Sequence, residues 1–273
     1  MKTILINGAN GFIGNKLIEK FIDQNNFKLV LSSYNDPSPQ LKKLLNSNIK
    51  FIKSDISNIE SVYDCVLRCD HIFHLASIVG KNFCEKDIYN TFDTNVLGSL
   101  NFFRACKDAK KKITYLSIPN LDDYSLYALS KSCSDRFAQM YLNLHNLDIS
   151  IIRLFNCYGI NQNEKSGKLI INVLKNAIQN KPIKVFGNGK QKLNFIYIDD
   201  VIKGLSELPN NHKKGIFYFG SDVELTVNEV ITKIIKITES KSEIIYENNR
   251  VGDDNIDITL KESVQKIFLD KYI

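Results

Sequence analysis

A glycine-rich turn near the start of the chain constrains the fold more than any other feature. Residues 3–6 are largely β-branched, which predicts a strand, and the apolar spacing over 12–21 predicts a helix. The connection between them carries Gly8, Gly11 and Gly14. Glycines let backbone N–H groups approach a pyrophosphate closely, and a helix N-terminus adds its own N–H groups and the positive end of its dipole. This context predicts a dinucleotide-binding βα unit.

Strand-like and helix-like segments alternate through the first half of the chain. We expect strands over 27–31, 49–52, 71–75, 113–116 and 149–154, with helices over 62–67, 96–105 and 126–144. Such alternation predicts an α/β fold with a Rossmann-like, doubly wound parallel sheet.

The alternation of strand-like and helix-like segments becomes less regular after residue 154, and no Gly/Ser or Pro linker marks a domain boundary. Further helices are expected over 169–178, 199–208 and 227–237, with short strands over 182–186 and 195–198. We therefore expect a dinucleotide-binding Rossmann domain over 1–155. A smaller, interleaved C-terminal lobe over 156–273 should be mainly substrate-binding, with some segments returning to the first domain.

Composition narrows the class of protein further. The 273 residues are 44% hydrophobic and 24% charged, which excludes wholesale disorder. No apolar run is long enough to span a membrane and the N-terminus lacks a signal-peptide core, so we expect a cytoplasmic protein without a membrane partner. The net charge of +6 is scattered, so no nucleic-acid partner is expected. The six cysteines form no C-x-x-C pair or Cys/His cluster, so no metal site is expected.

The end of the second predicted strand bears on the choice between NAD and NADP. An acid there binds the ribose 2′-hydroxyl of NAD, whereas its absence tolerates the 2′-phosphate of NADP. Ser32 and Ser33 occupy this end, and the nearest acid, Asp36, comes later. Because both serines could donate hydrogen bonds to a phosphate, we expect NADP in preference to NAD.

Tyr127 and Lys131 stand at positions i and i+4 of a predicted helix and therefore share one face. An ammonium beside a phenol lowers the tyrosine pKa from its usual value of about 10. Such a tyrosine can exchange a proton with an alcohol or ketone while a nicotinamide exchanges a hydride. The spacing alone is also that of an ordinary helix surface.

In combination, these motifs resemble the extended short-chain dehydrogenase/reductase family, in particular its nucleotide-sugar epimerases, dehydratases and ketoreductases. The similarity runs in order over nearly the whole chain. Further matching motifs are Asp55-Ile56, His74-Leu75-Ala76-Ser77, Asn95-Val96-Leu97-Gly98-Ser99, Tyr115-Leu116-Ser117, Arg153-Leu154-Phe155-Asn156-Cys157-Tyr158-Gly159, Val185-Phe186-Gly187-Asn188-Gly189 and Arg250-Val251-Gly252-Asp253.

The residues and the resemblance together define a candidate site. We expect the cofactor to be held by Gly8, Asn10, Gly11, Phe12, Ile13, Gly14, Ser32, Ser33, Asp55, Ile56, Leu75, Ala76, Ser77, Asn95, Tyr127 and Lys131. The resemblance implies that Tyr127, Lys131 and Ser117 are catalytic. It also implies that Asn156, Lys192 and Arg250 contact a nucleotide-sugar substrate.

The active-site hydroxyl is the main departure from the family pattern. Ser117 and Tyr127 are only ten residues apart, and strict alignment puts Ile118 where the family has its Ser or Thr. The hydroxyl could come from Ser117, from Ser125, or be absent.

Two further departures concern substrate chemistry. Pro119 and Asn120 replace the acidic pair that dehydratases of this family place here, so dehydration is not expected. Asn194 stands in the segment where the family has an Arg-Asp pair before Phe, a lost phosphate contact that Lys190 or Lys192 could replace.

Three functions remain open at this point. The first is reduction of a 4-keto (deoxy)sugar nucleotide, which the short loop and the absence of an acidic cofactor selector favour. The second is an NAD-dependent 4-epimerase, and the third is a dinucleotide-binding module without catalysis. A homodimer is also possible, with Phe102, Phe103, Phe137 and Tyr141 either covering a helical seam or filling the monomer core.

Overall fold

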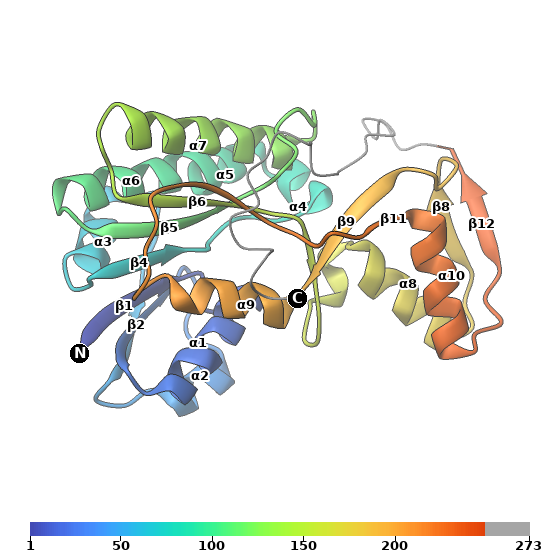
Figure 1. Ribbon diagram of the computed structural model, residues 1–273, viewed down its shortest axis with the longest axis horizontal. Coiled ribbons are helices and arrows are strands. Elements are labelled where there is room, and N and C mark those ends of the chain that lie inside the picture. Colours follow the sequence, from blue (N-terminus) through green and yellow to red (C-terminus); the bar gives the residue numbers. More distant parts are fainter. Residues whose placement is uncertain (249–273) are drawn as a thin grey trace.

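A parallel seven-stranded sheet forms the centre of the computed structural model, which describes residues 1–248 apart from the side chain of Lys165 (Figure 1). The strands run in the order β10–β6–β5–β4–β1–β2–β3, and every neighbouring pair is parallel. They are β1 (Lys2–Asn7), β2 (Phe27–Ser33), β3 (Ile49–Lys53), β4 (His71–His74), β5 (Lys112–Ser117), β6 (Ile149–Leu154) and β10 (Gly215–Phe219). The predicted Rossmann-like α/β fold is confirmed.

Helices cover both faces of this sheet (Figure 1). One face carries α1 (Phe12–Gln24), α2 (Pro39–Leu44) and α9 (Ile198–Glu207). The other carries α3 (Ile59–Val66), α6 (Gly98–Asp108) and α7 (Leu126–Asn143). Two short helices, α4 (Lys81–Lys86) and α5 (Ile88–Phe92), and a π-helical turn, η1 (Asp93–Leu97), lead into α6.

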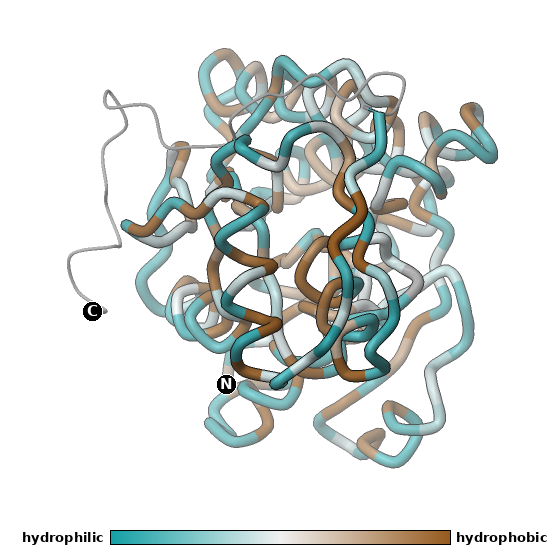
Figure 2. The backbone as a smooth tube through the Cα atoms, turned by 90° about the vertical axis from the view of Figure 1, so that its right-hand side faces the viewer, coloured by the Kyte–Doolittle hydropathy of each residue, from teal (hydrophilic) through white to brown (hydrophobic). Residues whose placement is uncertain are grey.

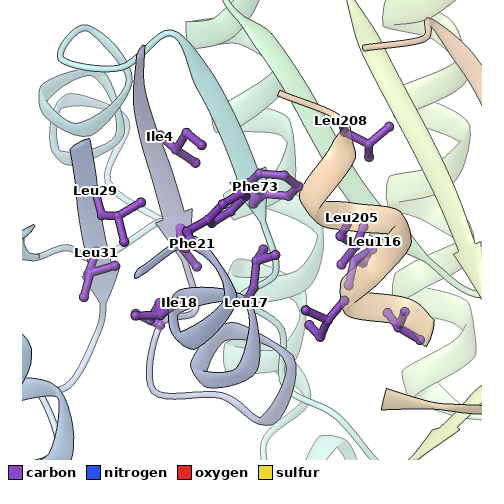
Figure 3. Packing of buried hydrophobic residues seen from close by; sticks show 14 of the residues in the cluster. Ile4, Leu17, Ile18, Phe21, Leu29, Leu31, Phe73, Leu116, Leu205 and Leu208 are labelled. Atoms are coloured by element: carbon purple, nitrogen blue, oxygen red, sulfur yellow. The ribbon is translucent and has the colours of Figure 1, made fainter. Parts of the chain in front are cut away.

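The two faces have separate hydrophobic cores because neighbouring residues of a strand point to opposite sides. Ile4 of β1 packs with α1 and α9, whereas Leu5 packs with α3 and α6. Figure 3 shows the first core, where Phe21 of α1 lies beside Phe73 of β4 at a ring separation of 5.8 Å. Because α1 buries its apolar side against this sheet, the glycine turn at the start of α1 is held in a fixed position.

The second half of the chain adds two small sheets (Figure 1). One contains β7 (Asn156–Tyr158), β9 (Lys192–Tyr197) and β11 (Glu224–Thr226). The other pairs β8 (Ile183–Phe186) with β12 (Ile244–Glu247), and η2 (Glu164–Ser166), α8 (Leu169–Ile178) and α10 (Val227–Thr238) complete this part. Figure 2, seen from the side of α8 and α10, shows hydrophobic and hydrophilic stretches alternating along the chain, as amphipathic elements require.

Three of the aromatic residues considered for a helical seam belong to the core instead. Phe102, Phe103 and Tyr141 are buried within the cluster between the sheet and the helices α6 and α7. The exposed apolar side chains nearby are Ile88, Tyr89 and Phe92 of α5. None of the helices within residues 1–248 is long and apolar enough to cross a membrane.

Candidate active site

A pocket of about 590 Å³ lies where the carboxyl ends of β1, β4, β5 and β6 meet the second half of the chain. Ligands of open α/β sheets bind at this edge. The pocket wall includes these predicted site residues: Gly8, Gly11, Phe12, Ile13, Gly14, Leu75, Ser77, Ser117, Tyr127, Lys131 and Asn156. The wall does not include Asn10, Ser32, Ser33, Asp55, Ile56, Ala76, Asn95 or Lys192. Arg250 lies outside the described residues.

The glycine turn forms a cradle that side chains would fill. Gly8 has a φ of +86°, and a Cβ there would lie 2.7 Å from the backbone nitrogen of Ala76. A Cβ on Gly14 would collide with the carbonyl of Gly8. Gly11 precedes α1, and no side chain caps this helix N-terminus. The first N–H groups of α1 therefore remain available to an anion, and the cradle fits the pyrophosphate of a dinucleotide.

The end of β2 gives little support to a preference for NADP. The Ser32 hydroxyl is fully buried and accepts a hydrogen bond from the Asn7 amide at 3.0 Å, so a ribose phosphate cannot reach it. Ser33 alone is half-buried at the strand end. Asn10 shapes the turn that follows, because its side chain bonds the backbone of Asp36 and Ser38, each at 3.0 Å.

The predicted adenine contacts sit in the loop after β3. The Asp55 carboxylate accepts hydrogen bonds from the backbone and hydroxyl of Ser57, at 2.9 and 2.7 Å. Ile56 is buried, and its side chain packs against Gly98 at the start of α6. In this structure the pair orders the β3–α3 loop next to α6.

Asn95 does not line the pocket, and its side chain instead connects the loop after β4 to α7 by hydrogen bonds. It lies in η1, and its buried amide oxygen accepts hydrogen bonds from Ser77 Oγ and from the backbone N–H of Ile78, at 2.9 and 2.8 Å. Its amide nitrogen donates to the Ile78 carbonyl and to Ser130 Oγ, at 3.0 and 2.9 Å. Because the amide is fully used, Asn95 ties the loop after β4 to α7.

Tyr127 and Lys131 both face the pocket from α7. Lys131 is 4% exposed, and its Nζ donates to the Leu116 carbonyl at 2.6 Å and lies 4.4 Å from the centre of the Tyr115 ring. Burial lowers the pKa of Lys131 to about 7, although Asp135 raises it in part. Burial raises the pKa of Tyr127.

The expected lowering of the tyrosine pKa is therefore wrong for this state of the protein. The physical reason is that desolvation of the phenol dominates, while the Lys131 nitrogen is directed to the Leu116 carbonyl.

Ser117 is also engaged within the protein. Its hydroxyl donates to Asp135 Oδ2 at 2.5 Å, and Asp135 is fully buried. Arg153 binds the same carboxylate through Nε and Nη2, at 3.1 and 2.7 Å, and donates to Tyr218 at 2.6 Å. Since a hydroxyl has one proton, Ser117 in this state has no donor left for a substrate oxygen.

Two pocket residues were not identified as site residues from the sequence. One carries a charge without an opposite charge beside it, and the other carries a hydrogen-bond donor without an acceptor, within residues 1–248. Lys168 precedes α8 and lines the pocket, burial lowers its pKa, and no carboxylate within residues 1–248 pairs with it. The Nδ2 atom of Asn120 is shielded from solvent and has no hydrogen-bond partner in this part of the chain. Lys190 and Lys192, the expected phosphate contacts, are exposed and do not line the pocket. Only the basic side chain after Gly167 could have signalled Lys168 in the sequence.

Comparison with known proteins places the chain among nucleotide-sugar enzymes. It is 28% identical over 270 residues to UDP-N-acetyl-alpha-D-glucosaminuronate decarboxylase of Bacillus cytotoxicus, covering 90% of this chain and 83% of that protein. The structure of UDP-glucuronic acid 4-epimerase from Bacillus cereus with UDP-glucuronic acid and NAD superposes with a TM-score of 0.80 at 24% identity, covering 94% and 90% of the two chains.

UDP-N-acetylglucosamine 4-epimerase from Methanobrevibacter ruminantium superposes with a TM-score of 0.82 at 22% identity, covering 96% of this chain and 90% of that one. The family description that matches residues 4–218 is that of the NAD dependent epimerase/dehydratase family. This match spans most of the chain and includes the glycine cradle, Ser117, Tyr127 and Lys131. The chain belongs to the NAD dependent epimerase/dehydratase family.

Proposed function

We propose that this protein is an NAD-dependent enzyme that oxidises and re-reduces C4 of a nucleotide-linked sugar, and so acts as a nucleotide-sugar 4-epimerase. The observation that carries the proposal is one pocket that joins the glycine cradle of α1 to Tyr127 and Lys131 of α7. A dinucleotide held by the cradle and a sugar beside the tyrosine would share this space.

NAD is the proposed cofactor. The preference for NADP depended on the missing acid at the end of β2 and on Ser32 and Ser33 as hydrogen-bond donors, and the burial of Ser32 removes one of these two donors. The Bacillus cereus 4-epimerase with a similar fold was solved with NAD. When bound, NAD supplies the acceptor and donor of the hydride that C4 loses and regains.

A nucleotide diphosphate sugar fits the charge of the pocket. Lys168 brings an ammonium into the wall with no carboxylate beside it in the described residues, so an anionic ligand would satisfy it. Asn156 lies in the same wall and is held by a hydrogen bond to the Asn194 carbonyl at 2.9 Å. We propose that the part of the chain after residue 155 mainly holds the nucleotide sugar, as the sequence predicts.

The chain's own residues supply the proton chemistry. Tyr127 as the phenolate accepts the proton of the C4 hydroxyl while the C4 hydrogen leaves as a hydride, so the carbon becomes a ketone. Rotation of the keto sugar and return of both groups inverts C4. The Lys131 ammonium, once released from Leu116, stabilises the phenolate during these steps.

Reduction of a separately supplied 4-keto sugar is the second candidate. The short connection between β5 and α7, residues 118–125, supports it, because this compact loop resembles that of the small reductases of the family. The same Tyr127 would then donate its proton to the ketone in one direction only.

The test is cofactor stoichiometry with a panel of nucleotide sugars. An epimerase interconverts two C4 epimers with catalytic NAD and no net change in nicotinamide absorbance. A reductase consumes one reduced cofactor for each keto sugar. Binding of NAD and sugar nucleotides with no conversion of any sugar would instead support a non-catalytic module and contradict the proposal.

A further inference from the structure

We propose that the side-chain amide of Asn120 donates the hydrogen bond to the reacting sugar oxygen, in place of the hydroxyl that the family has at the position of Ile118. The inference rests on the proposed function, because it assigns a partner to the oxygen on C4. It concerns a residue that the resemblance associates only with the loss of dehydratase acids.

The two positions nearest the expected hydroxyl cannot provide it. Ile118 occupies the aligned position, and its side chain has no polar atom. Ser117 gives its only proton to Asp135, which Arg153 holds in place. Moving that proton into the pocket would leave a fully buried carboxylate with one donor fewer.

Asn120 has the donor that these positions lack. Its Oδ1 accepts a hydrogen bond from the backbone N–H of Asp122 at 3.2 Å, which distinguishes the amide oxygen from the nitrogen. Its Nδ2 is shielded and has no acceptor within residues 1–248. Buried donors without acceptors are rare in folded proteins, so this one calls for a specific reason.

The location of Asn120 supplies that reason. It lies three residues beyond β5 and seven residues before Tyr127, and both residues line the same pocket. Nδ2 has no acceptor within residues 1–248, so a sugar oxygen bound beside Tyr127 is the acceptor that we assign to it, once substrate binding uncovers this shielded nitrogen.

Ser125 is the remaining competitor, and its oxygen already has a structural role. It caps α7 by accepting the backbone N–H of Ala128 at 3.3 Å. Its backbone N–H donates to Asp123 at 2.6 Å, which further orders this turn. The cap uses Ser125 Oγ only as an acceptor, so its hydroxyl proton remains a competing donor, and Ser125→Ala is therefore part of the test below.

The chemistry requires a donor and no further proton acceptor. Negative charge develops on the C4 oxygen as Tyr127 takes its proton, and a fixed N–H dipole stabilises that charge. An amide does not ionise at neutral pH, so Asn120 leaves the proton transfer to Tyr127. An acid in its place would repel the developing charge.

The test compares Asn120→Ala with Asn211→Ala, an exposed asparagine at the opposite edge of the sheet, before β10. We expect Asn120→Ala to lower kcat about 100-fold, while the Kd values for NAD and UDP stay unchanged. The melting temperature should change little, because the variant removes a shielded donor without a partner in residues 1–248 together with the long hydrogen bond from the Asp122 backbone N–H. Asn211→Ala should match the wild type in all of these.

A rescue variant separates a direct role from a structural one. Ile118→Thr in the Asn120→Ala protein restores a hydroxyl at the aligned position and should recover kcat by about tenfold. A structural defect in the loop would not respond to this change.

Three outcomes would overturn the inference. In the first, Tyr127→Phe abolishes turnover but Asn120→Ala turns over at the wild-type rate, so the proposed function stands and the assignment of Asn120 fails. In the second, Ser125→Ala loses kcat while Asn120→Ala does not, which transfers the role to Ser125. In the third, the wild type converts no nucleotide sugar, and then the proposed function and this inference fail together.

Discussion

The Ser117 hydroxyl donates a hydrogen bond of 2.5 Å to the Asp135 carboxylate, and the Arg153 guanidinium donates to the same carboxylate. This pair links the last residue of β5 to the middle of α7, so it fixes the strand end relative to the helix that carries Tyr127. The serine that resembles a catalytic group is thus part of the scaffold that positions the tyrosine.

Removing Asp135 should cost far more stability than removing Ser117. Asp135→Ala leaves the Arg153 charge without its partner and is expected to lower the free energy of unfolding by about 3–5 kcal/mol. Ser117→Ala removes one hydrogen bond and should cost about 1 kcal/mol. Urea unfolding measures both, with the exposed Asp64→Ala as the matched control. Equal losses for the two variants would contradict this account of the network.

The depressed pKa of Lys131 should make stability depend on pH. Between the folded pKa of about 7 and the ordinary lysine value of 10.5, the unfolded chain binds more protons than the folded one. Stability contributed by this group is therefore complete above the unfolded pKa and is lost as the pH falls toward 7.

The variant Lys131→Met removes this dependence. The difference in the free energy of unfolding, wild type minus variant, should rise by about 1–3 kcal/mol between pH 7 and 10. Lys20→Met, an exposed lysine of α1, should show no such rise. A flat difference for Lys131→Met would mean that the lysine is not desolvated in the free protein.

Gly8 and Gly11 should respond differently to alanine. Gly8→Ala places a side chain at a φ of +86° and against the backbone of Ala76, so it should cost stability by about 1–2 kcal/mol. Gly11 has a φ of −78°, and a Cβ there would meet only the Gly8 carbonyl, at 3.0 Å.

Gly11→Ala should therefore largely preserve the fold but weaken NAD binding by about tenfold or more, because its methyl enters the phosphate cradle. Thermal unfolding and titration with NAD separate the two effects. Unchanged NAD affinity in Gly11→Ala would show that the pyrophosphate does not lie on this turn.

The variant Lys168→Met tests whether the Lys168 ammonium binds the diphosphate of the substrate. Removing the ammonium should weaken UDP binding by about tenfold and flatten its dependence on salt, since a charge-assisted contact is lost. The free protein should become slightly more stable, because a half-buried charge without a carboxylate partner within residues 1–248 has been removed. Lys50→Met on β3, which is exposed, serves as the control. Wild-type affinity in Lys168→Met would place the diphosphate elsewhere.

The strongly periodic elements could be predicted from the sequence. The strand over 149–154 and the helix over 169–178 coincide with β6 and α8. The helix expected over 62–67 begins earlier, at Ile59, because Asn58 caps it by accepting hydrogen bonds from the backbones of Glu60 and Ser61. Short elements such as α4 and β10 lack enough residues to display a period, and β10 reaches the central sheet only through its long-range pairing with β6.

The site was less predictable than the fold, because its chemistry depends on which groups its side chains bond to, and the sequence does not show these contacts. The sequence places Ser117 near the active centre but cannot show that its proton belongs to Asp135. It places Lys131 one turn from Tyr127 but cannot show that the Leu116 carbonyl binds the ammonium. Lys168 and Asn120 are conspicuous only once the structure shows that, within residues 1–248, the Lys168 ammonium has no carboxylate partner and the Asn120 amide nitrogen has no acceptor.

The most direct measurement follows the configuration at C4 by NMR after incubation of UDP- and dTDP-linked sugars with the protein and catalytic NAD. The account predicts that the wild type interconverts the C4 epimers of at least one sugar. Tyr127→Phe should bind NAD normally and lower the rate by about 100-fold or more. Interconversion that survives undiminished in Tyr127→Phe, or its absence for every sugar in the wild type, would contradict the account.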